Sequence, residues 1–320
     1  MGALLPLALH AQAPATGRVW RVGVLGVNTR EAGMVVVEAL EKGLAGAGYV
    51  IGLNLLIDYR TAEGKVERLP ELAAGLVEAK VDVIVTSTNH ATRAAQRATT
   101  SIPIVMTVAS DPVVEGFAKS LGRPGGNITG LTFDAAPEAY AKPLEFLRQI
   151  FPRESRIAWI LSPDEGKPVD AAHKQAIRDA APKLGLSLAT VRVEGRDDVE
   201  PSVERVRRLG VKAFLWHPGQ NVLGTEQRFA IAALKAQLAL ASVWPGVADA
   251  GGLLGYGPDV PDLFRRAAIH IDKIFKGAKP SELPIEQPTR FLLHINGKTA
   301  KALGLKIPQS LLIRADRVIE

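Results

Sequence analysis

Residues 18–26 read Arg18-Val19-Trp20-Arg21-Val22-Gly23-Val24-Leu25-Gly26, an alternating stretch that becomes apolar and ends in glycine. This pattern predicts a buried strand. From Thr29 to Ala47 apolar side chains recur every three or four residues, and Gly48 stands where a helix C-cap is expected. The stretch and its neighbour therefore predict a strand followed by a helix, the unit from which parallel sheets are built.

The same alternation continues downstream. Further strands are predicted at 55–59, 81–86 and 104–108, with helices at 66–79 and 91–99 between them. Turn-forming residues at 122–127 interrupt the rhythm, and 128–133 is predicted as a strand beside this break. A second set then follows, with helices at 138–150, 169–184, 199–209 and 225–237 and strands at 156–161, 187–193 and 213–217. Two successive α/β halves predict two doubly wound parallel-sheet lobes.

The domain organisation follows from these halves and from the length of 320 residues. We expect a first lobe at 18–133 and a second at 134–252. Beyond them come a short strand at 253–256, an amphipathic helix at 261–276 and a segment kept extended by Pro280, Pro284 and Pro288. We expect 253–288 to return to the first lobe and 289–320 to pack on the second.

Composition narrows the class of protein. The formal charge is +6, but basic and acidic residues are interleaved and no nucleic-acid motif appears, so no nucleic-acid partner is expected. The chain has no cysteine, which excludes disulfides, thiolate nucleophiles and lipid attachment through a cysteine. Residues 1–15 are uncharged and apolar through Leu9, and Ala11-Gln12-Ala13 fits a signal-peptidase site. We expect a signal peptide and a periplasmic protein that is not lipid-anchored; the alternative is a merely apolar N-terminus.

Candidate ligand-binding residues follow from a rule of doubly wound sheets, in which ligands bind where strands end and helices begin. The predicted strand ends and the loops after them supply polar side chains in both halves: Asn28, Thr29, Ser87, Thr88, Asn89, Ser110, Asp111, Ser162, Asp164, Gln220 and Asn221, with Tyr256 in the short strand at 253–256. The alternative for Thr29, Thr88 and Asn89 is helix capping alone, and Asp111-Pro112 also resembles a cap followed by a first helical proline. A cleft lined by hydroxyls, amides and the Asp111 carboxylate suits a small zwitterion, with Asp111 on its ammonium group.

Enzyme signatures are weak. The loop after the first strand has no dinucleotide-binding or phosphate-loop glycine pattern, and no nucleophile elbow is present. The six histidines show no metal-ligand spacing; His173 and His270 are interpreted as structural or exposed, while His90 and His217 lie at strand ends. No cofactor and no metal are therefore expected.

Several segments resemble the tryptophan/tyrosine-type family of ABC-transporter substrate-binding proteins. They are Gly48-Tyr49-Val50-Ile51-Gly52-Leu53-Asn54, Ile102-Pro103-Ile104-Val105, Ser110-Asp111-Pro112, Leu121-Gly122-Arg123-Pro124-Gly125-Gly126-Asn127-Ile128-Thr129-Gly130 and Leu283-Pro284-Ile285-Glu286-Gln287-Pro288-Thr289-Arg290-Phe291. The resemblance implies a type I periplasmic binding protein fold, in which a multi-strand hinge joins two lobes that close over a small-molecule solute.

The resemblance also implies a role and partners. It implies capture of an amino acid or related small carboxylate, delivery to an ABC permease in the inner membrane, and a monomer. Ser87, Thr88, Ser110, Asp111 and Asn221 carry over as binding residues. The chain departs from the usual pattern at Asn28-Thr29-Arg30-Glu31 and at Gln220, in the loops that would contact the solute. Two alternatives stay open, an enzyme on the same scaffold and the ligand-sensing domain of a regulator.

Overall fold

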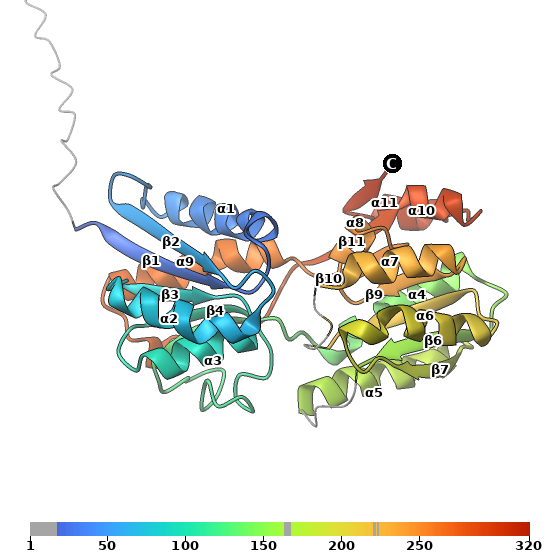
Figure 1. Cartoon of the computed structure of the whole chain (residues 1–320), viewed down its shortest axis with the longest axis horizontal. Helices are drawn as coiled ribbons and strands as arrows, with labels where there is room; N and C mark the ends of the chain where they lie inside the picture. Colours follow the sequence, from blue (N-terminus) through green and yellow to red (C-terminus); the bar gives the residue numbers. More distant parts are fainter. Residues whose placement is uncertain (1–17, 163–167, 220–221, 223) are drawn as a thin grey trace, which may run out of the picture.

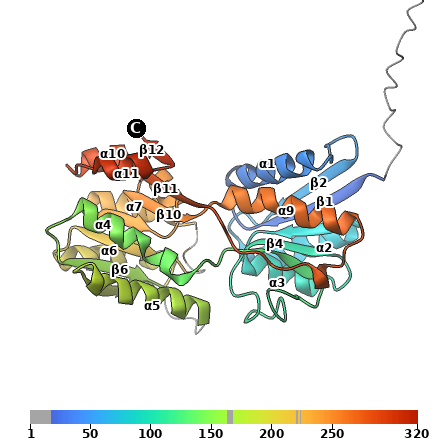
Figure 2. The same cartoon turned by 180° about the vertical axis from the view of Figure 1, so that it is seen from behind.

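The computed structural model describes residues 18–162, 168–219, 222 and 224–320. The chain forms two lobes, each built on one central sheet with helices on both faces (Figure 1). The same two lobes and the segments that cross between them are seen from behind in Figure 2. This is the predicted fold class, two doubly wound lobes joined by crossing segments.

The first lobe holds a parallel five-stranded sheet in the order β2-β1-β3-β4-β5. Its strands are β1 (Trp20–Gly26), β2 (Leu55–Thr61), β3 (Val83–Thr86), β4 (Ile104–Ala109) and β5 (Ile128–Thr132), and its helices are α1 (Arg30–Gly46), α2 (Leu69–Glu78), α3 (Asn89–Ala98) and α9 (Val260–Phe275), with short 3-10 turns η1 (Val66–Arg68) and η5 (Pro280–Glu282).

The second lobe holds a seven-stranded sheet in the order β12-β11-β10-β9-β8-β6-β7. Its strands are β6 (Arg156–Leu161), β7 (Ser187–Arg192), β8 (Ala213–His217), β9 (Ala239–Ser242), β10 (Leu254–Pro258), β11 (Phe291–Asn296) and β12 (Arg317–Ile319). Its helical segments are η2 (Pro137–Ala141), α4 (Lys142–Ile150), α5 (Pro168–Lys183), η3 (Arg196–Asp198), α6 (Val199–Arg208), α7 (Glu226–Lys235), α8 (Gly246–Asp249), α10 (Gly297–Ala302) and α11 (Gln309–Arg314). All its strand pairs are parallel except β10 with β11, so the sheet is mixed rather than purely parallel.

Strand β1 shows why both faces of the first sheet need helices. Successive side chains of a strand point to opposite faces. Val22 and Val24 belong to one buried cluster, which includes residues of α1 and α9, and Leu25 belongs to another, which includes residues of α2 and α3. The predicted apolar run is therefore a strand buried on both sides, as the central strands of parallel sheets are.

Helix α1 begins and ends where local sequence signals predict. The Thr29 hydroxyl accepts a hydrogen bond from the Ala32 amide at 3.3 Å, which satisfies one free N–H of the first turn. Gly48 follows the helix with φ of +89°, a conformation that glycine adopts without steric cost.

Three segments connect the lobes. One leads from β5 to η2, one from β10 to α9, and one from η5 to β11. The last two run side by side, because the Asp259 amide donates to the Arg290 carbonyl at 3.0 Å and Pro258 pairs with Phe291. The first is linked to them through the Thr132 amide, which donates to the Glu286 carbonyl at 2.9 Å. Three linked crossings form a hinge that permits closure and limits sliding.

One expected boundary is wrong. Residues 253–258 do not return to the first lobe, because β10 pairs with β9 and β11 inside the second sheet. The chain crosses only after Pro258, and α9 then packs on α1. Pairing with strands distant in sequence decides where this strand belongs, and the local sequence at 253–256 carries no signal for that pairing. In the described part of the chain, no helix has the length and apolarity needed to cross a bilayer.

Candidate functional site

A cavity of about 970 Å³ lies between the two lobes and is lined by both. Its volume is at the upper end of the range common for small-molecule sites. Eight predicted site residues line it: Asn28, Thr29, Ser87, Thr88, Asn89, Ser110, Asp111 and Ser162. Further lining residues that sequence reasoning did not select are Phe133, Asp134, Tyr140, Asp170, His173, Lys174, His217 and Trp244.

The first-lobe wall contains two helix N-termini. Thr29 caps α1, and the Thr88 hydroxyl caps α3 by accepting from the Ala91 amide at 3.2 Å. The capping alternative is thus observed for both threonines, which also line the cavity. Because helix N-termini carry free N–H groups and partial positive charge, this wall favours a carboxylate.

Asn89 and Ser110 join two strand-end loops. The Asn89 side-chain amide donates to the Ser110 carbonyl at 2.9 Å, and its oxygen accepts from the Ser110 amide at 2.7 Å. Both ends of the Asn89 side chain are therefore used inside the protein. Asn89 holds the Ser110 loop in place, and Ser110, half-buried, lines the cavity.

Two carboxyl groups lie together beside this loop. Asp111 is 4% exposed and has φ of +53°, in the left-handed region where Asp and Asn are the side chains best tolerated after glycine. No helix begins at Pro112, so the capping alternative for Asp111 is wrong. The backbone of Asp111 is held instead by Asp134, whose Oδ2 accepts from the Asp111 amide at 2.7 Å and from the Thr132 hydroxyl at 2.8 Å.

Burial is the main influence on the pKa of Asp134, whose side chain belongs to a residue only 6% exposed. Burial raises the pKa of this carboxyl, and hydrogen bonds from the Asp111 amide, Thr132 and Ser110 act in the opposite direction without cancelling it. Asp134 lies two residues beyond the end of β5 and directly after the predicted strand at 128–133, so the strand-end rule selects it once it is applied to this strand as well.

The second-lobe wall carries an ion-pair cluster. Lys174, 2% exposed, pairs with Asp170 at 2.5 Å, and the His217 Nε2 lies 3.4 Å from the same carboxylate. Burial acts to raise the pKa of Asp170, but hydrogen bonds from His217 and Lys174 outweigh it and lower this pKa to about 2. Asp170 and Lys174 are four residues apart in α5, a spacing that places both on one face of the helix.

His173 lies in α5 between Asp170 and Lys174 in sequence and packs on η2. Its ring stacks on Tyr140 with a centroid distance of 3.6 Å, and its centroid is 6.4 Å from that of His217. Burial, reinforced by the charge of His217, lowers the pKa of His173 to about 4. His173 and His217 both line the cavity; for His173 the sequence predicts a structural or exposed role, and the side chain is buried.

The pKa of His173 predicts a pH dependence of stability. The imidazole titrates near 6.5 when unfolded and near 4 when folded, so the unfolded chain binds more protons between these values. The contribution is therefore complete above about pH 6.5 and is lost as the pH falls toward 4. His173→Phe keeps a ring on Tyr140. When the free energy of unfolding is measured with urea across this pH window, its dependence on pH should be smaller in His173→Phe than in wild type by up to about 1.4 kcal/mol per pH unit. His90→Gln, at an exposed histidine, is the control. If the free energy of unfolding depended on pH equally in wild type and His173→Phe, the lowered pKa of His173 would be contradicted.

Tyr256, the remaining predicted residue that the structure describes, does not line the cavity. Tyr256 packs instead on Phe146 and Phe291, with centroid distances of 5.4 and 5.8 Å. Because side chains alternate along β10, Gly255 and Gly257 face Pro245 on the other side of the strand. Asp164, Gln220 and Asn221 lie outside the described residues.

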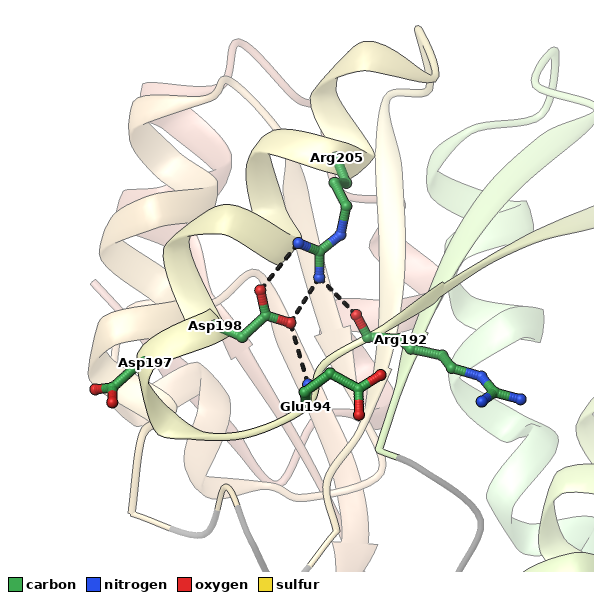
Figure 3. A pocket seen from close by; sticks show the side chains of 5 residues that line it. All are labelled: Arg192, Glu194, Asp197, Asp198 and Arg205. Atoms are coloured by element: carbon green, nitrogen blue, oxygen red, sulfur yellow. Dashed lines mark hydrogen bonds and ion pairs between the residues drawn. The ribbon is translucent and has the colours of Figure 1, made fainter.

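A second, shallower hollow lies in the second lobe beside η3 and is lined by Arg192, Glu194, Asp197, Asp198 and Arg205 (Figure 3). Arg205 pairs with Asp198 at 2.7 Å and also donates to the Arg192 carbonyl at 2.7 Å. These groups serve to join η3 to α6 and β7, so the interlobe cavity is the candidate site. Within the described residues, no group of three His, Cys, Asp or Glu is placed to hold a metal ion.

Comparison with known proteins shows to which family this two-lobed chain belongs. Residues 21–319 match the family described as ABC transporter substrate binding protein. The chain belongs to this family. ABC transporter substrate-binding proteins capture small-molecule solutes outside the cytoplasm and present them to a membrane permease. Membership of this family therefore implies two partners, a small-molecule solute and an ABC permease.

Individual relatives of this substrate-binding protein support the assignment. A tyrosine-binding protein of Clostridioides difficile is 26% identical over 83% of this chain and 75% of its own length. A conserved domain protein from Vibrio cholerae is 26% identical, with a TM-score of 0.81 over 94% of this chain and 100% of its own. The ABC domain in complex with L-Trp from Streptococcus pneumonia is 24% identical and shares the fold with the same TM-score and coverage.

Proposed function

We propose that this substrate-binding protein captures an amino acid or related small carboxylate in the interlobe cavity. The observation that carries the proposal is a single cavity lined by polar groups of both lobes, with helix N-termini on one wall. The names of two similar proteins, one tyrosine-binding and one in complex with L-Trp, point to the same class of solute.

In the proposed complex, different residues bind the carboxylate, the ammonium group and the remainder of the solute. Ser87, Thr88 and the first turn of α3 would receive its carboxylate, because N–H groups and hydroxyls are donors. Asp111 would receive its ammonium group, since a buried carboxylate gains most from a charged donor. Ser162, whose Oγ accepts from the Gly219 amide at 3.1 Å, and the α5 cluster lie on the opposite wall and would contact the remainder of the solute.

Closure of the hinge would follow from this division. A solute held by both walls binds the closed arrangement more tightly than the open one, so it shifts the population toward closure. The closed form would dock on the permease. Since one chain supplies both walls, no second copy is needed to complete the site, and we propose that the protein acts as a periplasmic monomer without catalytic turnover.

The proposal predicts stabilisation by a small solute. A ligand present at a hundred times its Kd adds about 2.7 kcal/mol to the free energy of unfolding. A thermal-shift screen of the purified protein against amino acids, small carboxylates and nucleosides, followed by calorimetry, should therefore identify at least one stabilising compound. If no compound stabilised the protein, or if one were chemically converted, solute capture would fail as its function.

A further inference from the structure

We propose that Asp134 forms a cation subsite in this cavity, in which its Oδ1 accepts a hydrogen bond from a positively charged amine of the solute. This inference rests on the proposed function and narrows it, because it requires a solute with an amine. It adds a binding residue next to Asp111 and makes the amine more important for affinity than the carboxylate.

The first support is the hydrogen bonding of Asp134. Its Oδ2 is fully used by the Asp111 amide and the Thr132 hydroxyl, at 2.7 and 2.8 Å. The Ser110 hydroxyl influences the pKa of this carboxyl, but the buried Oδ1 forms no hydrogen bond of normal geometry with any described residue. Buried carboxylate oxygens are normally satisfied, so an unsatisfied one on a cavity wall indicates a missing donor.

The second support is charge. Among the described lining residues there are five carboxylates, Asp111, Asp134, Asp170, Glu226 and Asp249, and two basic side chains, Lys174 and Arg317. This is a surplus of three negative charges in a chain whose formal charge is +6. The cavity is thus acidic within a basic protein, which favours positively charged groups.

The third support is that both basic side chains of the cavity lining pair with carboxylates other than Asp134. Lys174 pairs with Asp170 at 2.5 Å, and Arg317 pairs with Asp249 at 3.1 Å. None of the ion pairs formed between described residues includes Asp134. A carboxylate that is 94% buried without a counter-ion is costly, and a bound ammonium group would supply that counter-ion.

Matched probes separate the amine from the carboxylate. Three of the probes share one ring. L-Tyrosine carries both the amine and the carboxylate, tyramine carries only the amine, and 3-(4-hydroxyphenyl)propionate carries only the carboxylate. L-Arginine and agmatine extend the set to a longer amine-bearing chain. Calorimetry should detect binding of amine-bearing probes and none of the propionate. Binding of the propionate alone, or of no amine-bearing probe, would overturn the subsite, even where other solutes in the wider screen uphold solute capture.

Two substitutions separate ligand contact from a supporting role. Asp134→Asn keeps an oxygen for the Asp111 amide and the Thr132 hydroxyl but removes the charge, and it should weaken amine-bearing probes about tenfold. Asp134→Ala removes the supporting bonds as well. If Asp134→Asn bound these probes like wild type while Asp134→Ala did not, Asp134 would only position Asp111 and the proposal would fail. Asp58→Asn, on the same lobe and paired with Arg60 outside the cavity, is the matched control.

Discussion

Replacing Asp111 by asparagine is expected to weaken the binding of an amine-bearing solute by about 10- to 100-fold, because a hydrogen bond between charged groups contributes about 1.5–3 kcal/mol. Asp111 is 4% exposed and lines the cavity, so little water screens its charge. Asparagine also tolerates its φ of +53°, so the loop should keep its shape. Calorimetry with L-tyrosine and tyramine measures the loss.

Two controls make the Asp111 result specific. Asp197→Asn removes an exposed carboxylate of the hollow beside η3 and should leave affinity unchanged. The double variant with Asp134→Asn should be less weakened than the two single losses combined, because both carboxyls would act on one amine. Independent, additive losses would place the two carboxyls on different parts of the solute, and unchanged affinity in Asp111→Asn would remove Asp111 from the site.

The second large effect is expected at Gly130, where substitution by alanine should lower the free energy of unfolding by more than about 3 kcal/mol. Gly130 has φ of +123°, and a Cβ there would lie 2.1 Å from the Met106 carbonyl oxygen. Both β4 and β5 would have to move apart at their paired residues. Because the Gly130 carbonyl also accepts from the Glu286 amide at 2.9 Å, the hinge would be disturbed too.

Urea unfolding followed by circular dichroism tests this expectation. Gly122→Ala is the matched control, since a Cβ at Gly122 meets nothing within 4 Å. Its free energy of unfolding should stay within about 0.5 kcal/mol of wild type. Where the unfolding curve shows two transitions, the one that shifts in Gly130→Ala relative to wild type is the one to compare. Equal midpoints for Gly130→Ala and Gly122→Ala would show that β5 accommodates the side chain.

The sequence was informative wherever the deciding interactions are local. The apolar run at Val22–Leu25, the cap at Thr29 and the stop at Gly48 each act within a few residues, and all three appear in the structure as expected. The strand-end rule likewise placed Ser87, Ser110 and Asp111 on the cavity, because parallel strands bring their carboxyl ends to one edge of the sheet.

The tertiary structure decided what depends on contacts between distant segments. Tyr256 turned away from the cavity because of the register of β10, and 253–258 joined the second sheet because β9 and β11 pair with it. The pair of Asp170 and His217, and the support that Asp134 gives to Asp111, join residues on different elements.

The sequence by itself therefore determined the fold class, the family resemblance and one wall of the cavity, since hydrophobic periodicity, capping and strand order are written in short stretches. Only the tertiary structure decided which charges meet in that cavity. Burial and pairing set the ionisation of Asp134, Asp170 and His173, and both depend on side chains that other elements bring into contact.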